Sequence, residues 1–186
     1  WVAVFIILFD IYWLLKTIFL SLHLVAAYRK MKKNIATGWL EELRRLQPGD
    51  LSKHFSIVKG WKDVWHLVIL PVYNEPLEVV RSSFAALAAS RYPLDRLIVV
   101  LATEGRAGEH ARMLGEALRR EFGKTFFRLL VTTHPGDIIG EIAGKGSNET
   151  WAGREAKKLV EELGIADERV VVSVFDSDTR VFPDYF

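Results

Sequence analysis

The chain has 186 residues, a formal net charge of +2, a hydrophobic fraction of 50% and no cysteine. This length suits about one domain. The small net charge gives no support for nucleic-acid binding through bulk electrostatics, and the lack of cysteine excludes disulfides and thiolate metal sites.

Residues 1–28 are almost wholly apolar and predict a transmembrane helix. At 1.5 Å per residue the helix would be about 40 Å long, more than a hydrocarbon core of about 30 Å. Four basic residues follow it, and the positive-inside rule places them in the cytoplasm: Arg29, Lys30, Lys32 and Lys33. Asp10, Lys16 and His23 interrupt the apolar run, and we expect them to face other helices rather than lipid. A buried core helix and an interfacial helix are the alternatives.

Residues 29–65 are predicted to form a basic juxtamembrane segment and a connector. Within them Leu40, Leu43 and Leu46 recur at helical spacing, which predicts a short helix. Residues 51–65 show no clear period, and we expect one short strand at most.

From residue 66 onward, apolar runs alternate with amphipathic stretches. Four runs predict buried strands, at 66–70, 97–102, 126–131 and 170–174. Three stretches predict helices, at 77–90, 109–122 and 150–163. Pro76 suits the first turn of the first helix, with Asn74 or Glu75 as its N-cap. This alternation predicts an α/β fold, a parallel sheet with helices on both faces.

Polar residues gather where the predicted strands end. In a parallel sheet all carboxyl ends lie at one edge, and ligands of open α/β sheets bind there. Four segments would share this edge: residues 71–75, residues 103–106, a glycine-rich loop at 132–148, and residues 176–178.

Two of these segments carry charges that suit a metal–phosphate ligand. Asp176 and Asp178 offer hard oxygen donors, which Mg²⁺ and Mn²⁺ prefer. Lys145 lies between Gly144 and Gly146, where an ammonium group could neutralise a diphosphate. The sequence therefore predicts a divalent-cation and phosphate site at this edge.

Each candidate also has a purely structural interpretation. Tyr73 could be a packed aromatic, and Glu104 a polar loop residue. Asn74 and Glu75 could only cap a helix, although Asn74 can do so while it touches a ligand. Lys145 could be a solvated loop lysine, and the two aspartates could belong to a solvated turn.

Three motifs, in this order and at these strand ends, resemble glycosyltransferase family 2. They are Leu70–Glu75 (LPVYNE), Gly144-Lys145-Gly146 with Asn148, and Asp176-Ser177-Asp178. The likeness covers residues 66–186. It implies a GT-A fold, a Rossmann-like parallel sheet that binds nucleotide-diphosphate sugars, of which residues 66–186 would form the donor-binding half.

The resemblance also implies roles for individual residues. Pro71, Tyr73 and Glu75 would border the nucleoside, and Lys145 would lie near the donor's phosphates. Asp176 would face the nucleoside and sugar. Asp178 would bind the Mg²⁺ or Mn²⁺ that bridges the diphosphate, with Asp176 beside it as a second metal ligand.

Two departures from the family pattern are visible. Many members carry an Asp-Asp-Gly-Ser run after the second strand, whereas this chain has Thr103-Glu104-Gly105, so Glu104 would substitute as the donor-binding acid. The family's catalytic base belongs to a later motif, which would lie beyond Phe186. We therefore expect the sequence to be part of a longer protein.

From the resemblance we expect a membrane-anchored glycosyltransferase of the hexosyltransferase type. It would transfer a sugar from a UDP- or GDP-linked donor to a hydroxyl of a glycan or lipid-linked acceptor, with metal dependence and inversion. Its catalytic domain would face the cytoplasm at a bacterial-type inner or plasma membrane. The alternatives are a nucleotidyltransferase-like enzyme on the same type of sheet and a non-catalytic membrane scaffold that retains the fold.

Overall fold

The computed structural model describes residues 1–46 and 58–186. The chain divides into two compact units, residues 1–39 and residues 40–186, and each is described by itself. Much of the predicted connector, including residues 51–57, lies outside the described residues. Its described end holds a 3₁₀ turn, Trp61–Asp63, and the first strand begins directly afterwards, at Trp65.

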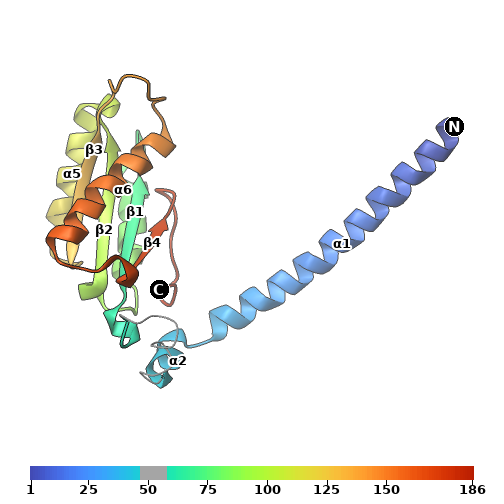
Figure 1. Ribbon diagram of the computed structural model, residues 1–186, viewed down its shortest axis with the longest axis horizontal. Coiled ribbons are helices and arrows are strands. Elements are labelled where there is room, and N and C mark those ends of the chain that lie inside the picture. Colours follow the sequence, from blue (N-terminus) through green and yellow to red (C-terminus); the bar gives the residue numbers. More distant parts are fainter. Residues whose placement is uncertain (47–57) are drawn as a thin grey trace. The chain divides into compact units, whose positions relative to one another are not determined.

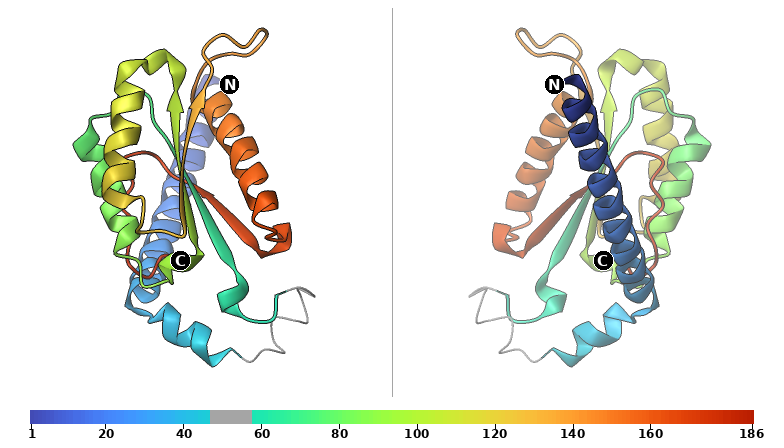
Figure 2. Two further views of the ribbon diagram at one scale, coloured as in Figure 1. Left: turned by 90° about the vertical axis from the view of Figure 1, so that its left-hand side faces the viewer. Right: turned by 90° about the vertical axis from the view of Figure 1, so that its right-hand side faces the viewer.

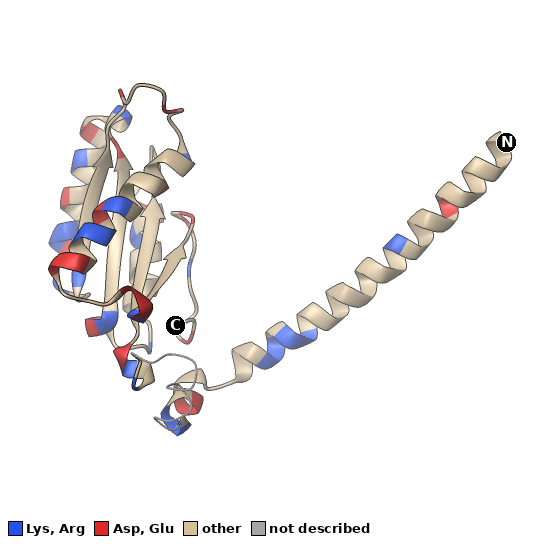
Figure 3. Cartoon of the chain, viewed as in Figure 1, with Lys and Arg blue, Asp and Glu red and all other residues tan. Residues whose placement is uncertain are grey.

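The first unit is built on one long helix, α1 (Val2–Ala36), which continues eight residues past the predicted end (Figure 1). Its side chains are exposed throughout, and it is long and apolar enough to cross a membrane. Basic residues are concentrated in its C-terminal part (Figure 3). The predicted short helix is present as α2 (Trp39–Arg45), nearly all of which belongs to the second unit. That the polar faces of α1 meet other helices stays a prediction.

The second unit contains a four-stranded sheet in which every neighbouring pair is parallel, as predicted. The strands follow the order β3-β2-β1-β4 across the sheet (Figure 1). Their bounds are Trp65–Pro71 (β1), Leu97–Glu104 (β2), Arg128–His134 (β3) and Val170–Val174 (β4). Because all four run in one direction, their carboxyl ends share one edge, which is where the candidate residues were expected.

Helices cover both faces of this sheet, which confirms the predicted layering (Figure 2). α4 (Leu77–Ala88) and α5 (Glu109–Phe122) lie on one face, and α6 (Lys145–Glu162) lies on the other. Alternate residues of β1 and β2 point to the two layers, so both strands are almost wholly buried. On the α6 side, Ala152 and Ala156 are fully buried, and their small side chains let the helix approach the strands closely. Three further 3₁₀ turns precede or follow strands, at Leu94–Arg96, Gly105–Ala107 and Asp167–Arg169.

The segment after β4 closes the α4 side of the sheet. Phe175, Val181 and Phe186 pack against the core formed by β1, β2, α4 and α5. The backbone N–H of Arg91 donates to the oxygen of Pro183 at 2.8 Å, which ties this segment to the end of α4. The turn that follows β4 therefore has neighbours that hold its position.

The prediction that residues 170–174 form a fully buried strand was wrong. The strand is present, but Val172 is 56% exposed, and Val171 and Val174 are exposed as well. β4 is an edge strand, and α6 packs over β1, β2 and β3 rather than over it. The apolar composition of β4 therefore does not reflect burial by the residues that the structure describes.

Several element boundaries also differ from the prediction, among them those of β3, which runs from Arg128 to His134 rather than over 126–131. α6 begins at Lys145 rather than Thr150, so the connecting loop is confined to residues 135–144 and Lys145 opens a helix. The Ser147 hydroxyl donates to the Gly144 oxygen at 2.7 Å and receives the Gly144 N–H at 3.0 Å, which stabilises this early start. The N-cap of α4 is Pro76 itself, not Asn74 or Glu75.

Candidate functional site

The ends of β1 and β2, the turn after β4 and the first turns of α6 meet in a pocket of about 100 Å³. It is lined by Pro71, Val72, Glu75, Glu104, Lys145, Asn148, Asp176 and Ser177. Five of these were chosen from the sequence: Pro71, Glu75, Glu104, Lys145 and Asp176. The other three candidates do not line the pocket. Tyr73 lies beside it, and Asn74 and Asp178 are exposed on the two flanking turns.

Lys145 and Asp176 form an ion pair across the pocket mouth, between Nζ and Oδ1. Lys145 is the first residue of α6, and Asp176 lies two residues past β4. Both side chains remain more than half exposed, at 55% and 66%. Hydrogen bonding to Asp176 raises the pKa of Lys145 above its ordinary value, with smaller contributions from Glu149, whose Oε1 lies 3.8 Å away. The ammonium group is therefore charged at neutral pH and accessible to solvent.

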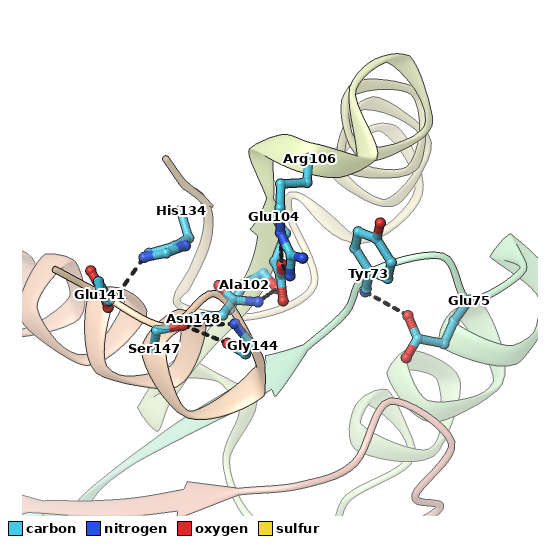
Figure 4. Close-up of polar contacts among 10 residues, drawn as sticks. All are labelled: Tyr73, Glu75, Ala102, Glu104, Arg106, His134, Glu141, Gly144, Ser147 and Asn148. Atoms are coloured by element: carbon cyan, nitrogen blue, oxygen red, sulfur yellow. Dashed lines mark hydrogen bonds and ion pairs between the residues drawn. The ribbon is translucent and has the colours of Figure 1, made fainter. Parts of the chain in front are cut away.

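Glu104 carries a buried negative charge that Arg106 neutralises (Figure 4). The Glu104 side chain is 5% exposed, and its Oε2 accepts hydrogen bonds from Arg106 Nε at 2.9 Å and from Nη2. The guanidinium group also lies over the Tyr73 ring, 5.1 Å from its centroid. Glu104, Arg106 and Tyr73 thus form one connected polar and aromatic surface at the rim of the pocket.

Arg106 was not among the residues chosen from the sequence. A signal was available, since a basic residue stands two positions after a carboxylate at a predicted strand end. Gly136, in the loop after β3, makes room for it: a Cβ at this position would lie 2.7 Å from Arg106 Cγ. Arg106 is thereby held between the loop and the Tyr73 ring.

Glu75 shapes the turn after β1 instead of capping α4. Its Oε2 accepts a hydrogen bond from the Tyr73 backbone N–H at 2.6 Å (Figure 4). Its own backbone oxygen lies 3.0 Å from His110 Nε2 of α5. These two contacts fix the turn that presents Tyr73.

The turn that carries Asp176 and Asp178 is held by one hydrogen bond of its own and by bonds to β1 and α4. The Phe175 N–H donates to the Ile69 oxygen at 3.0 Å, and the Thr179 N–H donates to the Asp176 oxygen at 2.9 Å. Ser177, between the two aspartates, is buried, and its backbone oxygen accepts a hydrogen bond from the Ser83 hydroxyl. Both carboxylates therefore project from a backbone that is already ordered.

This turn suits a divalent cation that shares its ligands with a phosphate. Within residues 1–46 and 58–186, no group of three or more His, Asp or Glu side chains is placed to hold a metal ion. Mg²⁺ is commonly held by only one or two carboxylates, with phosphate oxygens and water as its other ligands. The ammonium group on Asp176 shows that this carboxylate can accept a cation. The residues present thus fit a metal that arrives with a phosphate.

His134 is a second residue that sequence reasoning left unassigned. It ends β3 opposite Glu104, is 2% exposed, and has Nε2 3.4 Å from Glu141 Oε1 (Figure 4). Its ring meets the Trp151 ring edge-on, with 5.8 Å between centroids. Neither ring nitrogen reaches hydrogen-bond geometry with any residue that the structure describes. His134 packs between the loop and α6 and does not line the pocket.

Asn148 anchors α6 to the sheet at the back of the pocket. It is buried, and its Nδ2 donates to the Ala102 oxygen at 2.8 Å. Since a carbonyl oxygen only accepts, this contact fixes which way the amide points. This hydrogen bond fixes how closely the first turn of α6, which carries Lys145, approaches β2.

Comparison with known proteins adds no relative: no protein-family model matches the chain, and no curated protein matches it. The resemblance to glycosyltransferase family 2 therefore depends on the motifs of the sequence and on where the structure places them.

Proposed function

We propose that residues 66–186 form the donor-binding half of a GT-A glycosyltransferase domain. It would transfer a sugar from a UDP- or GDP-linked donor to an acceptor hydroxyl. The observation that carries this proposal is the convergence of Pro71, Glu75, Glu104, Lys145 and Asp176 on one pocket at the carboxyl edge of a parallel sheet. These residues come from four separate segments, and the edge is where open α/β sheets bind ligands.

The nucleoside would lie against the surface formed by Tyr73, Arg106 and Glu104. An aromatic ring capped by a guanidinium group offers a flat face on which a base can stack. Beside it, the Glu104 carboxylate and the remaining Arg106 N–H groups supply an acceptor and donors for hydrogen bonds. The small pocket next to this surface suits the ribose.

The diphosphate would lie between Lys145 and the first turn of α6. A helix leaves its first N–H groups without intrahelical partners, and its N-terminus favours negative charge. The Lys145 ammonium group adds a full positive charge at the same end. This is the charge pattern that phosphate groups bind.

Asp176 and Asp178 would hold the Mg²⁺ or Mn²⁺ that accompanies the diphosphate. When bound, the metal supplies Lewis-acid stabilisation of the departing nucleoside diphosphate. The ordered turn places the two carboxylates before the donor arrives, which lowers the entropic cost of binding.

Sugar transfer would proceed by direct displacement with inversion, as in the family that the chain resembles. The residues described above would hold and orient the donor. In that family the general base that takes the proton from the acceptor hydroxyl belongs to a later motif than those that hold the donor.

We further propose that α1 anchors the enzyme in a membrane. Its apolar length supports a spanning orientation, and the basic cluster Arg29–Lys33 supports a cytoplasmic position for the residues that follow. The acceptor would then be a glycan or a lipid-linked molecule at the membrane.

The test is binding of UDP- and GDP-sugars to the full chain in detergent micelles, with and without Mn²⁺, by isothermal titration calorimetry. We expect Mn²⁺ to strengthen binding by at least about ten-fold and Asp178→Ala to abolish this gain. Asp95→Ala is the matched control, because Asp95 is exposed and precedes the opposite end of β2.

Three outcomes separate the possibilities. Metal-dependent binding that Asp178→Ala removes and Asp95→Ala keeps supports the proposal. Binding that does not depend on Mn²⁺, or that Asp178→Ala leaves unchanged, refutes the metal role. A complete lack of binding to any nucleotide sugar refutes the donor site and leaves a membrane scaffold as the better account.

A further inference from the structure

The carboxylate of Asp176 already has a cationic partner, the ammonium group of Lys145. The two side chains come from distant parts of the sequence and meet at the mouth of the pocket. A metal ion that uses Asp176 therefore competes with Lys145 for this carboxylate.

The geometry allows this exchange without a change in the fold. Lys145 is the first residue of α6, and the paired hydrogen bonds between Gly144 and Ser147 fix the helix start, so only the lysine side chain has to move. Glu149, one helical turn on, has its Oε1 3.8 Å from Nζ and can receive the ammonium group when it leaves Asp176. Both members of the pair are more than half exposed, so water and ions reach them directly.

We infer that Lys145 is a built-in competitor for the metal site, which keeps Asp176 neutralised until a diphosphate draws the ammonium group away. This inference rests on the proposed function. The metal and the diphosphate then bind as one unit, and the metal alone binds weakly. The residue that would contact the phosphates is also the one that weakens binding of a metal arriving without them.

Charge balance gives the reason for this coupling. With Lys145 on Asp176, a divalent cation meets a neutralised carboxylate and a nearby positive charge, and like charges repel. A nucleoside diphosphate brings several negative charges to the N-terminus of α6, where Lys145 can pair with them instead. An exposed ion pair shifts a competing equilibrium by about two- to five-fold, and that is the size of effect we expect.

The test measures Mn²⁺ binding to the full chain in detergent micelles by electron paramagnetic resonance, with and without UDP or GDP. Lys145→Gln is expected to bind Mn²⁺ alone about two- to five-fold more tightly than the wild type and to bind the nucleoside diphosphate more weakly. The gain in Mn²⁺ affinity on adding UDP or GDP should be smaller in this variant. Lys145→Arg keeps the charge and should behave like the wild type.

Lys157→Gln is the matched control. Lys157 lies on the same helix and pairs with Asp167 and Glu161, away from the pocket. Its removal should leave Mn²⁺ binding unchanged in the absence of nucleotide.

Equal or weaker Mn²⁺ binding by Lys145→Gln without nucleotide overturns the inference. So does a complete lack of Mn²⁺ binding by all variants. If the wild type fails to bind UDP or GDP, the proposed function falls, but the comparison of Mn²⁺ affinities without nucleotide still tests Lys145 as a competitor.

Discussion

The Ser83 hydroxyl of α4 donates to the backbone oxygen of Ser177 at 2.7 Å. Ser83 is fully buried, and Ser177 separates the two aspartates of the candidate metal site. One hydrogen bond thus joins the hydrophobic layer on one side of the sheet to a turn at its functional edge. The position of the two carboxylates depends on the packing of α4.

We expect Ser83→Ala to lower the free energy of unfolding by about 1–2 kcal/mol, because the Ser177 oxygen loses a buried partner. Mn²⁺ binding in the presence of UDP should weaken as well, since the turn becomes less ordered. Urea denaturation and paramagnetic resonance measure the two effects. Ser90→Ala is the control: Ser90 lies just after the same helix, and its hydroxyl accepts the Tyr92 backbone N–H at 3.1 Å instead of contacting the turn. Equal metal binding by both variants would show that this bond does not position the turn.

We expect Arg106→Gln to destabilise the fold by about 3 kcal/mol, because it leaves the buried Glu104 carboxylate without its partner. Adding Glu104→Gln to this variant should recover part of the loss, since the uncompensated charge is gone. A double-mutant cycle in urea measures the coupling.

Arg112→Gln is the matched control for this prediction. Arg112 pairs with Glu109 and Glu116 on an exposed face of α5, so its loss should cost far less than the loss of Arg106. If both arginine variants cost the same small amount, Glu104 is neutralised by something other than Arg106.

The stability of the fold should fall as the pH drops from about 6.5 toward 4, in part because of His66. Burial lowers the pKa of His66 to about 4, whereas an unfolded histidine titrates near 6.5. The unfolded chain therefore binds a proton more readily in this window, which favours unfolding. Since the ring is only partly buried, we expect a contribution of about 1–3 kcal/mol, fully present above pH 6.5.

Replacing this histidine by Phe isolates its effect. The His66 ring lies between the rings of Tyr92 and Phe186, with its centroid 4.6 and 5.0 Å from theirs. A phenyl ring at this position would keep the aromatic packing. The difference in unfolding free energy between wild type and His66→Phe should change between pH 7 and pH 5. A constant difference would assign the acid sensitivity to other groups.

Gly136→Ala should disturb the proposed nucleoside-binding surface of Glu104, Arg106 and Tyr73. The added Cβ would lie 2.7 Å from Arg106 Cγ and would push the guanidinium group away from the other two side chains. We expect a loss of about 1–2 kcal/mol in stability and weaker binding of UDP or GDP. In contrast, Gly153→Ala, inside α6 and with open space around it, should add about 0.5–1 kcal/mol through helix propensity. If Gly136→Ala is neutral, Arg106 does not depend on this loop.

The sheet and its helices were predictable where the local pattern and the tertiary environment agree. The apolar runs at β1 and β2 are buried on both sides, and α5 begins and ends where its periodicity predicts. The start of α6 was not predictable, because Gly-Lys-Gly-Ser has low helix propensity. Ser147 stabilises it through local hydrogen bonds to Gly144, and Asn148 does so through a bond to Ala102, which is distant in the sequence.

The candidate site shows the same division. Lys145 and Asp176 were chosen because strand ends converge, and the structure brings them together. Arg106 was missed because its importance depends on Glu104 being buried, which is a property of the folded chain. The exposure of β4 was missed for a related reason: hydrophobicity alone does not tell an edge strand from a central one.

The edge position of β4 also has a consequence for dynamics. β4 is the shortest strand, with five residues, and it is joined to the described sheet through β1 alone. Local opening of the second unit should therefore start there, and its amide hydrogens should exchange with solvent before those of β1 and β2. Since Asp176 and Asp178 follow this strand directly, a bound metal and diphosphate would slow that exchange. Amide protection along β4 would then report occupancy of the site even when no sugar is transferred.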